Sequence, residues 1–203
     1  TDYLLINPNR KKKPSSLTEN NYGRKKTIAL THFGRSGTGL FHSLIDGHSS
    51  VSTLPSIYFS EFFEPTNWKK IISGGWDNAV EKFMMTYDVL FDANSLVPIQ
   101  SRSGKLYSIG KKEGMANLGL DKNEVFTVDK ALFEKELKRL LSQYTNITSF
   151  DFFHLVHTAY DLSIGDTADK KVLFYHIHNP STAALINFSH FSPDINWVMM
   201  IRE

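Results

Sequence analysis

Cysteine is absent from the 203-residue chain, which excludes disulfide bonds and thiolate metal sites. Long apolar runs are absent as well, so the sequence predicts no membrane-spanning helix. The first residues lack the pattern of a secretory signal peptide, and a chain without cysteine fits the reducing cytoplasm, where we expect this protein. Because the chain begins with Thr1 and not with Met, a trimmed targeting segment stays an open alternative.

The net charge is also small. The 23 lysines and arginines nearly balance 21 aspartates and glutamates, which leaves +2 and no overall attraction to nucleic acid. The basic residues gather near the start, at residues 10–13 and 24–26, where we interpret them as a solvated arm. Hydrophobic residues make up 41% of the chain and aromatic residues 13%, which is enough for a sizeable folded core.

The order of the predicted elements indicates an α/β domain that follows a lead-in arm. Residues 1–25 are interpreted as the arm and residues 26–203 as one domain. The predicted core strands are 27–30, 172–177 and 197–201. Helical spacing is found at 37–45, 79–91 and 182–188, after a cap at Asp129 as far as residue 144, and from residue 149 to an end marked by Gly165. Strands that alternate with helices favour a three-layer fold with a parallel sheet. Because a core strand lies at the very end of the sequence, we expect the domain to continue beyond residue 203.

In two stretches of the sequence the hydrophobic residues follow neither helical nor strand periodicity. Residues 51–75 are predicted to be irregular, because Pro55, Pro65 and a pair of glycines interrupt them. Residues 93–125 contain several glycines and are interpreted as loops with a short hairpin that cover a site.

The most informative stretch runs from residue 27 to residue 46 and predicts a buried strand, a glycine-rich turn and a helix. Such a turn aims free backbone N–H groups at one point, where an anion can bind. Glycines relieve backbone crowding, hydroxyls donate to anion oxygens, and Arg35 offers a planar fork for phosphate or sulfate. The other residues of the turn with these properties are Gly34, Ser36, Gly37, Thr38 and Gly39. An ordinary strand-to-helix turn is the alternative interpretation.

The chain does not supply the parts of a magnesium-nucleotide site. No Lys follows the glycines of the turn, as a nucleoside triphosphatase loop requires. One later strand ends in His178 and Asn179 and the other in Arg202, so neither provides an acid for Mg²⁺ at its end. A cation at a strand end indicates a second anion held by the protein alone, which fits a bis-phosphorylated nucleotide better than Mg-ATP.

Residues 33–48, Phe-Gly-Arg-Ser-Gly-Thr-Gly-Leu-Phe-His-Ser-Leu-Ile-Asp-Gly-His, resemble the 5′-phosphosulfate-binding loop and helix of sulfotransferases. The likeness is to branches with Arg-Ser-Gly-Thr in this loop, such as tyrosylprotein and bacterial carbohydrate sulfotransferases. Residues 197–203, Trp-Val-Met-Met-Ile-Arg-Glu, are similar to the start of that family's 3′-phosphate motif, a hydrophobic strand that ends in Arg.

The resemblance implies a fold related to P-loop nucleoside triphosphate hydrolases, with 3′-phosphoadenosine 5′-phosphosulfate (PAPS) as the sulfuryl donor. By position, it implies that Gly34 and the turn from Arg35 to Gly39 hold the 5′-phosphosulfate and that Arg202 holds the 3′-phosphate, without a metal. It further implies a Ser and a basic loop around the adenosine, both beyond Glu203.

Members of the family use Glu or His as the general base. Glu61 is the first candidate, because residues 60–63, Ser-Glu-Phe-Phe, resemble a Glu-Phe-Phe segment that carries the base in some bacterial carbohydrate sulfotransferases. Glu64 is a neighbouring alternative, and a surface acid is the other interpretation of Glu61. His178 is the second candidate, since ligands bind at the carboxyl edge of open α/β sheets, and His176 shares its face of the strand.

Several aromatic residues and histidines have competing interpretations. An aromatic group near Glu61 is either an acceptor platform or plain core, and core is favoured; it comprises Tyr58, Phe59, Phe62, Phe63 and Trp68. His154 and His157 lie one helical turn apart, which favours hydrogen-bonded core residues over a metal site with two ligands. His32, His42 and His48 flank the turn and are expected to support it.

The sequence as a whole favours a PAPS-dependent sulfotransferase that acts on a hydroxyl or amine of a small-molecule or carbohydrate acceptor. An ATP-dependent small-molecule kinase with a degenerate loop is one alternative. A non-catalytic nucleotide-binding or scaffold domain is the other.

Overall fold

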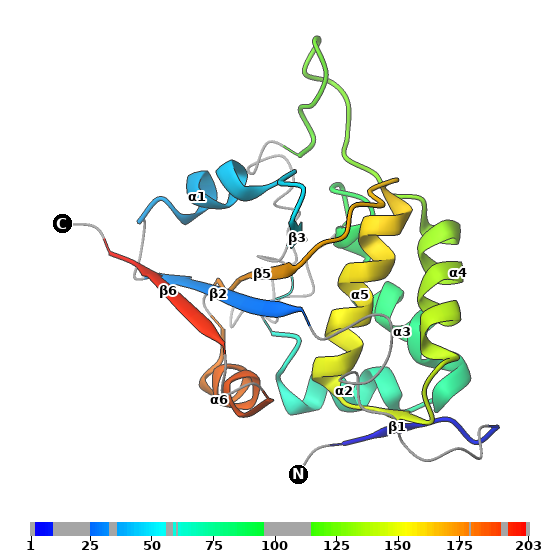
Figure 1. Cartoon of the computed structure of the whole chain (residues 1–203). Helices are drawn as coiled ribbons and strands as arrows, with labels where there is room; N and C mark the ends of the chain where they lie inside the picture. The colour runs from blue at the N-terminus through cyan, green and yellow to red at the C-terminus, as the bar shows by residue number, and fades with distance from the viewer. Residues whose placement is uncertain are drawn as a thin grey trace.

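The computed structural model describes residues 3–9, 25–32, 36–55, 59, 61–95, 115–178, 180–191 and 195–201. Figure 1 shows a central sheet with helices on either side of it. The strands of this sheet are β2 (Lys26–His32), β3 (Val51–Thr53), β5 (Val172–His176) and β6 (Asn196–Met200). They are all parallel, in the order β3-β5-β2-β6. The predicted α/β class with a parallel sheet is therefore confirmed.

The three strands predicted from the sequence end within two residues of their expected limits, whereas β3 was not predicted. In the middle of the sheet, Leu30 of β2 is paired with His176 on one side and with Val198 on the other. Ala29 and Leu30 are completely buried, as expected for a parallel strand that is covered on both faces.

The helices of the described part of the chain are α1 (Thr38–Ile45), α2 (Pro65–Ile72), α3 (Ala79–Thr86), α4 (Lys130–Leu141), α5 (Ser149–Ser163) and α6 (Thr182–Phe191), with the 3-10 turns η3 (Trp76–Asn78) and η4 (Asp88–Leu90). None of these described helices combines the length and the apolar character needed to cross a membrane.

Side chains that alternate along β5 assign the helices to two faces of the sheet. The ring of Phe174 lies 6.2 Å from that of Phe41 on α1. The ring of Tyr175 lies 4.9 Å from Phe153 of α5 and 5.1 Å from Phe188 of α6. Since neighbours along a strand point to opposite faces, α1 covers one face of the sheet and α5 with α6 cover the other.

Residues 51–75 were expected to be irregular, and this prediction is wrong, because β3 and α2 lie there. Pro65 does not break α2 but stands at its first position, where a missing N–H costs no helical hydrogen bond. Glu64 is the N-cap, and its Oε2 accepts a hydrogen bond of 2.7 Å from the backbone N–H of Thr66.

The second stretch, residues 93–125, was expected to hold loops and a short hairpin. Residues 96–114 of it lie outside the described residues, and Leu118 forms an isolated β-bridge with Glu124.

An aromatic cluster fills the space between the sheet and α2 to α5. The rings of Phe59 and Phe62 lie 4.6 Å apart, and that of Phe62 lies 5.0 Å from Phe63. These three rings and Trp68 are at most 3% exposed, so the interpretation of this group as core is confirmed for them. They are not available as a platform for an acceptor; Tyr58 lies outside the described residues.

Part of the predicted lead-in arm packs against the helices. β1 (Leu5–Ile6) pairs antiparallel with β4 (Asn146–Ile147), and Leu5 is only 2% exposed. The indole N–H of Trp68 donates a hydrogen bond of 2.7 Å to the carbonyl oxygen of Tyr3. Residues 3–9 therefore belong to the packed body of the protein.

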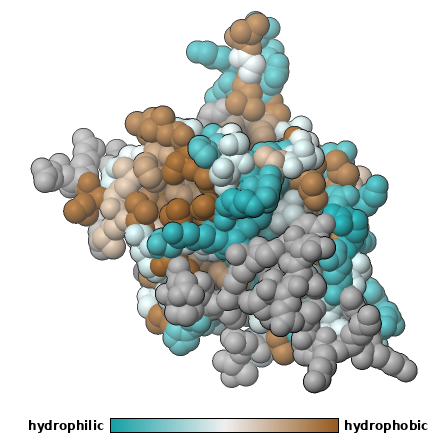
Figure 2. All heavy atoms as spheres, viewed as in Figure 1, coloured by the Kyte–Doolittle hydropathy of each residue, from teal (hydrophilic) through white to brown (hydrophobic). Residues whose placement is uncertain are grey.

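The outer face of α1 is apolar and uncovered. Leu40 and Leu44, one turn apart, are 69% and 75% exposed, and Figure 2 shows hydrophobic surface over α1. On β6, Trp197 and Met199 share a face and are also exposed. Side chains at the β6 edge of the sheet are thus more exposed to solvent than those on the face that α5 covers.

Candidate functional site

The topology of the sheet has a switch point at its carboxyl edge. From β2 the chain crosses past β5 to β3, whereas from β5 it crosses past β2 to β6. Connections that leave adjacent strands in opposite directions open a crevice outside the strand ends, and ligands of open α/β sheets bind there. This switch point, which we call the crevice, lies between the carboxyl ends of β2 and β5, and of the described residues those directly after His176 border it.

α1 begins at this edge, and no side-chain cap accepts hydrogen bonds from the backbone N–H groups of its first turn. Gly37 is its N-cap and has a φ of 84°, in the left-handed region that favours glycine. No side chain caps the helix, and the Oγ atom of Ser36 is buried without a hydrogen-bond partner among the described residues. Thr38, the first residue of the helix, is buried as well. An unsatisfied buried hydroxyl is costly, so this turn can gain from an acceptor such as an anion.

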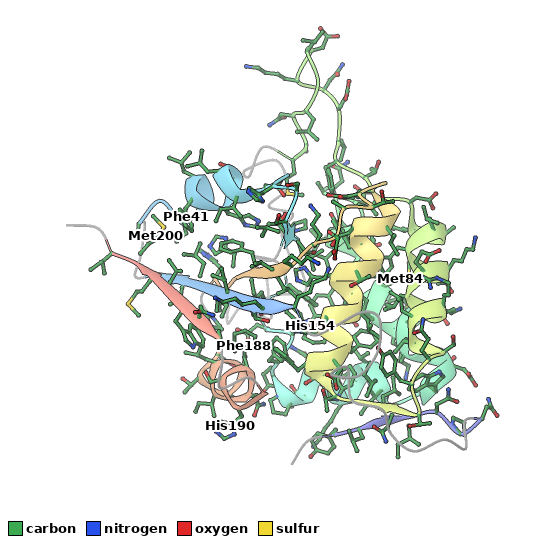
Figure 3. The ribbon with its side chains drawn as sticks, in the orientation of Figure 1. Phe41, Met84, His154, Phe188, His190 and Met200 are labelled. Atoms are coloured by element: carbon green, nitrogen blue, oxygen red, sulfur yellow. The ribbon has the colours of Figure 1, made fainter. Side chains whose placement is uncertain are left out.

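Three expected site residues, Gly34, Arg35 and Arg202, lie outside the described residues. Their neighbours show how the two motifs are placed. A Cβ atom added to Gly37 would lie 4.0 Å from the Cε atom of Met200, so the end of β6 lies beside the start of α1. Figure 3 shows Met200 in the space between α1 and the sheet. The two motifs found in the sequence therefore converge in space.

Three histidines connect α1 with the end of β5. The ring centroid of His178, which is half-buried, lies 6.4 Å from that of His176, which agrees with the predicted shared face. The Nδ1 atom of His176 lies 3.3 Å from the Nδ1 atom of His42 on α1. Burial lowers the pKa of His42, and the nearby carboxylate of Asp46 opposes this shift. The sequence did not predict the contact between His42 and His176.

Glu61 lies near the same edge but already has a backbone partner. Its Oε1 atom accepts a hydrogen bond of 2.7 Å from the N–H of Ser181, the residue before α6. Burial raises the pKa of Tyr87 and Tyr175, and the negative charge of Glu61 adds to both shifts. Since Ser181 follows His178 by three positions, the structure brings both predicted bases to one segment of the chain.

Two other candidates have local roles. The carboxylate of Glu64 caps α2 through Thr66, as described above. His48 is exposed, and its Nδ1 atom accepts a hydrogen bond of 3.1 Å from the N–H of Ser50. It therefore stabilises the turn that leads into β3. Neither side chain has a described contact with the start of α1.

A second polar cluster lies on the opposite face of the sheet, in the core. Ser52 of β3 donates a hydrogen bond of 2.7 Å to Oδ2 of Asp161, and its Oγ lies 3.0 Å from Nδ1 of His157. The Nζ atom of Lys25 lies 3.6 Å from the same Oδ2. Burial raises the pKa of Asp161 and lowers those of Lys25 and His157.

Ser, His and Asp also form hydrolytic triads, but Ser52 and His157 are 0% exposed, so no substrate reaches them. His154 is buried too, with Nε2 at 3.5 Å from Oγ1 of Thr27. The interpretation of His154 and His157 as hydrogen-bonded core residues is therefore confirmed.

A surface groove between α3 and α4 has the wrong charge for an anion. It measures about 430 Å³ and is lined by Glu81, Met84, Met85, Asp88, Lys130 and Glu134. The ammonium of Lys130 is already paired with Asp88 at 2.5 Å. Figure 3 shows Met84 on the far side of the molecule from Phe41, so the groove is separate from the crevice.

Comparisons with known proteins identify no relative. No protein-family model matches the chain, and no curated protein or solved structure matches it significantly. Within the ranges that the structure describes, no group of three or more His, Asp or Glu residues is placed to hold a metal ion. Any assignment of function therefore depends on the residues of the crevice.

Proposed function

We propose that this protein is a sulfotransferase that moves a sulfuryl group from PAPS to a hydroxyl or amine of a small-molecule or carbohydrate acceptor. The observation that carries the proposal is the uncapped start of α1, with the buried hydroxyl of Ser36, at the switch point of a parallel sheet. A helix N-terminus contributes about 0.3–2 kcal/mol toward binding an anion, and Arg35 would add charge-assisted hydrogen bonds.

The arrangement fits a donor with two anionic groups. The turn before α1 would hold the 5′-phosphosulfate through Ser36, Thr38 and backbone N–H groups. Arg202 follows β6 by two positions and would hold the 3′-phosphate. Gly37 and Met200 are neighbours, which supports the proposal that one nucleotide reaches both motifs. A P-loop-like nucleotide-binding fold is part of this proposal.

The reaction is an in-line displacement at sulfur. The bond between sulfur and the bridging oxygen of the donor breaks, a bond between sulfur and the acceptor atom forms, and the proton of the acceptor passes to a general base. Negative charge develops on the bridging oxygen, where the N-terminus of α1 and Arg35 stabilise it. The base must lie within hydrogen-bond reach of the acceptor.

Of the two candidate bases, His178 fits this role better than Glu61. His178 lies beyond the end of β5, on the same face as His176 and hence on the side of α1. Glu61 lies toward α6 and holds the N–H of Ser181. We therefore assign the base to His178 and give Glu61 a positioning role, since it fixes the start of α6 and with it the preceding chain.

Titration calorimetry tests this function with adenosine 3′,5′-bisphosphate, the product left after transfer. We expect saturable binding without Mg²⁺. Arg35→Ala should weaken this binding by about tenfold to 100-fold, because hydrogen bonds to charged groups contribute about 1.5–3 kcal/mol. Arg139→Ala is the matched control, since Arg139 is a surface arginine of α4 that pairs with Glu136.

Other outcomes would favour the alternatives. Binding of Mg-ATP without binding of the bisphosphate would favour a kinase. Binding of the bisphosphate, with no transfer of sulfate from PAPS to any sugar, phenol or amine tested, would favour a nucleotide-binding domain without catalysis. Binding of neither nucleotide by a folded chain would contradict the proposal.

A further inference from the structure

The contact between His42 and His176 joins a titratable pair to the start of α1. Their Nδ1 atoms lie 3.3 Å apart, and their rings meet edge to face with centroids 5.4 Å apart. His176 is 3% exposed, and the half-buried ring of His42 packs against Phe174 at 5.4 Å. A hydrogen bond between two Nδ1 atoms requires a hydrogen on one ring and a lone pair on the other.

This geometry allows the pair one added proton. After one protonation, an imidazolium ring donates to a neutral imidazole ring in a charge-assisted bond. A second proton would place two N–H groups head to head at 3.3 Å, so the contact would have to open. Protonation of the pair and the position of α1 on the sheet are therefore linked.

The charged groups around the pair come from three elements. At the end of α1, the carboxylate of the C-cap residue Asp46 attracts a proton on His42 and is held by a hydrogen bond from Thr53. On the β5 side, His178 repels that proton when it is itself charged. Across the sheet on α5, His157 would repel it as well, but burial keeps His157 neutral.

His42 lies one helical turn after Thr38, about 6 Å along the axis, so a proton on the pair lies close to an anion at the start of α1. We propose that His42 and His176 take up one proton when an anionic nucleotide binds at this turn, which makes His42 a positioning residue of the site. The inference rests on the proposed function, because it takes the turn as the anion site. By linkage, proton uptake means that affinity falls as the pH rises.

Calorimetry with adenosine 3′,5′-bisphosphate in buffers of different ionisation enthalpy measures this uptake at pH 6.5. The wild type should take up about 0.5–1 proton per nucleotide more than His42→Asn, and its Kd should rise by up to about tenfold per pH unit above pH 6.5. Protonation of the ligand's own phosphates is common to both proteins and cancels in the difference. Equal uptake by wild type and His42→Asn would overturn the inference.

His190→Asn is the matched control, because His190 lies on the outer side of α6, as Figure 3 shows, and is exposed. It should bind and take up protons as the wild type does. Asn keeps a polar atom near the position of Nδ1, so His42→Asn should still fold. If thermal unfolding shows that it does not, His42→Gln takes its place.

A measurement without nucleotide separates the two possible failures. Nitrogen-15 NMR of the imidazole rings should show His42 and His176 titrating as a coupled pair, and His42→Asn should shift the titration of His176. If the pair is coupled but no nucleotide binds, the proposed function and the anion-linked uptake fail, and only the proton sharing stands. If the two rings titrate independently, the inference fails whatever the nucleotide does.

Discussion

Ser52 on β3 and Asp161 on α5, 109 positions apart in the sequence, are joined by a hydrogen bond of 2.7 Å that the hydroxyl donates. The same oxygen lies 3.0 Å from Nδ1 of His157, so one small side chain connects two buried titratable groups. Buried polar groups are costly unless they are hydrogen-bonded, and a satisfied set specifies one arrangement of the elements that carry it. This cluster therefore helps to fix the position of α5 on the sheet.

Ser52→Ala should lower the free energy of unfolding by about 1–3 kcal/mol, because Asp161 and His157 lose their shared buried partner. Urea unfolding measures this loss. Ser189→Ala is the control, since Ser189 is exposed and donates to the carbonyl of Leu185 within α6. Its effect should stay within about 0.5 kcal/mol of the wild type. Equal effects of the two substitutions would contradict the role of Ser52.

Stability should also fall in mild acid, because His157 is buried as a neutral ring. Burial, with repulsion by Lys25, holds its pKa well below the usual 6.5. Below pH 6.5 the unfolded chain binds this proton and the folded chain does not, so stability that is complete above pH 6.5 is lost as the pH falls. From pH 7.5 to 5.5, His157 alone should lower the free energy of unfolding by about 1.4 kcal/mol.

Urea unfolding at both pH values, in wild type and His157→Gln, isolates this effect. The variant should be less stable overall but should lose less stability on acidification. Asp161 acts with the opposite sign, because its raised pKa lets the folded chain bind a proton first, and it acts in both proteins. His190→Gln should follow the wild type. The same pH dependence in wild type and His157→Gln would mean that His157 is charged in the folded chain.

Local signals predicted the long helices well. Asp129 was expected to cap α4, and its carboxylate accepts a hydrogen bond of 2.9 Å from the N–H of Leu132. Gly165, with a φ of 78°, follows the end of α5 as predicted. β3 has only three residues, too few to show the alternation of apolar and polar residues that predicts a strand. Its place in the sheet comes from pairing with β5, which lies far along the chain. Strand order likewise depends on contacts that no local pattern records.

In the candidate site, too, some features follow from a local sequence pattern and others depend on contacts between distant residues. The pattern of glycines and hydroxyls is a local signal, and it correctly predicts a turn at Ser36 and Gly37 that leads into α1. The contact of His42 with His176 joins residues 134 positions apart, and no local pattern predicts it. In the sequence, Glu61 and Glu64 are both acids beside the same aromatic residues, and only the resemblance of residues 60–63 ranks Glu61 first. The Pro that follows Glu64 is the signal that could have assigned it as a helix cap, because Pro is frequent at the first helical position.

Replacing Glu61 tests whether its carboxylate positions α6 or accepts the proton of the acceptor. Glu61→Gln keeps an oxygen for the N–H of Ser181, so it should cost less than about 1 kcal/mol of stability, whereas Glu61→Ala should cost about 1–2 kcal/mol. With Glu61→Gln, kcat for sulfate transfer should stay within about tenfold of the wild type. His178→Asn should lose at least about 100-fold, as expected for a general base.

The matched control is Glu81→Gln, since Glu81 is an exposed carboxylate of α3 that should affect neither stability nor kcat. Thermal unfolding of each variant separates loss of fold from loss of chemistry. A larger fall in kcat for Glu61→Gln than for His178→Asn would assign the base to Glu61.

Gly37 and Gly39 should respond in opposite directions to the same substitution. Gly37→Ala forces a side chain into the left-handed region and should cost about 1–2 kcal/mol, although the new Cβ would meet nothing closer than Met200 Cε at 4.0 Å. Gly39 lies inside α1, and apart from its chain neighbours and the helix backbone nothing lies within 4 Å of an added Cβ, so Gly39→Ala should add about 0.5–1 kcal/mol to the free energy of unfolding. Urea unfolding without ligand measures both changes.

For Gly39→Ala, nucleotide binding and the stability of the free protein should change in opposite senses. The space around it is open, and its N–H belongs to the uncapped first turn of α1, so a phosphosulfate would approach there. Gly39→Ala should therefore weaken binding of adenosine 3′,5′-bisphosphate in calorimetry while it stabilises the free protein, because the added methyl group takes up space that the anion needs. A variant that is more stable and binds the nucleotide as tightly as the wild type would place the anion elsewhere on the molecule.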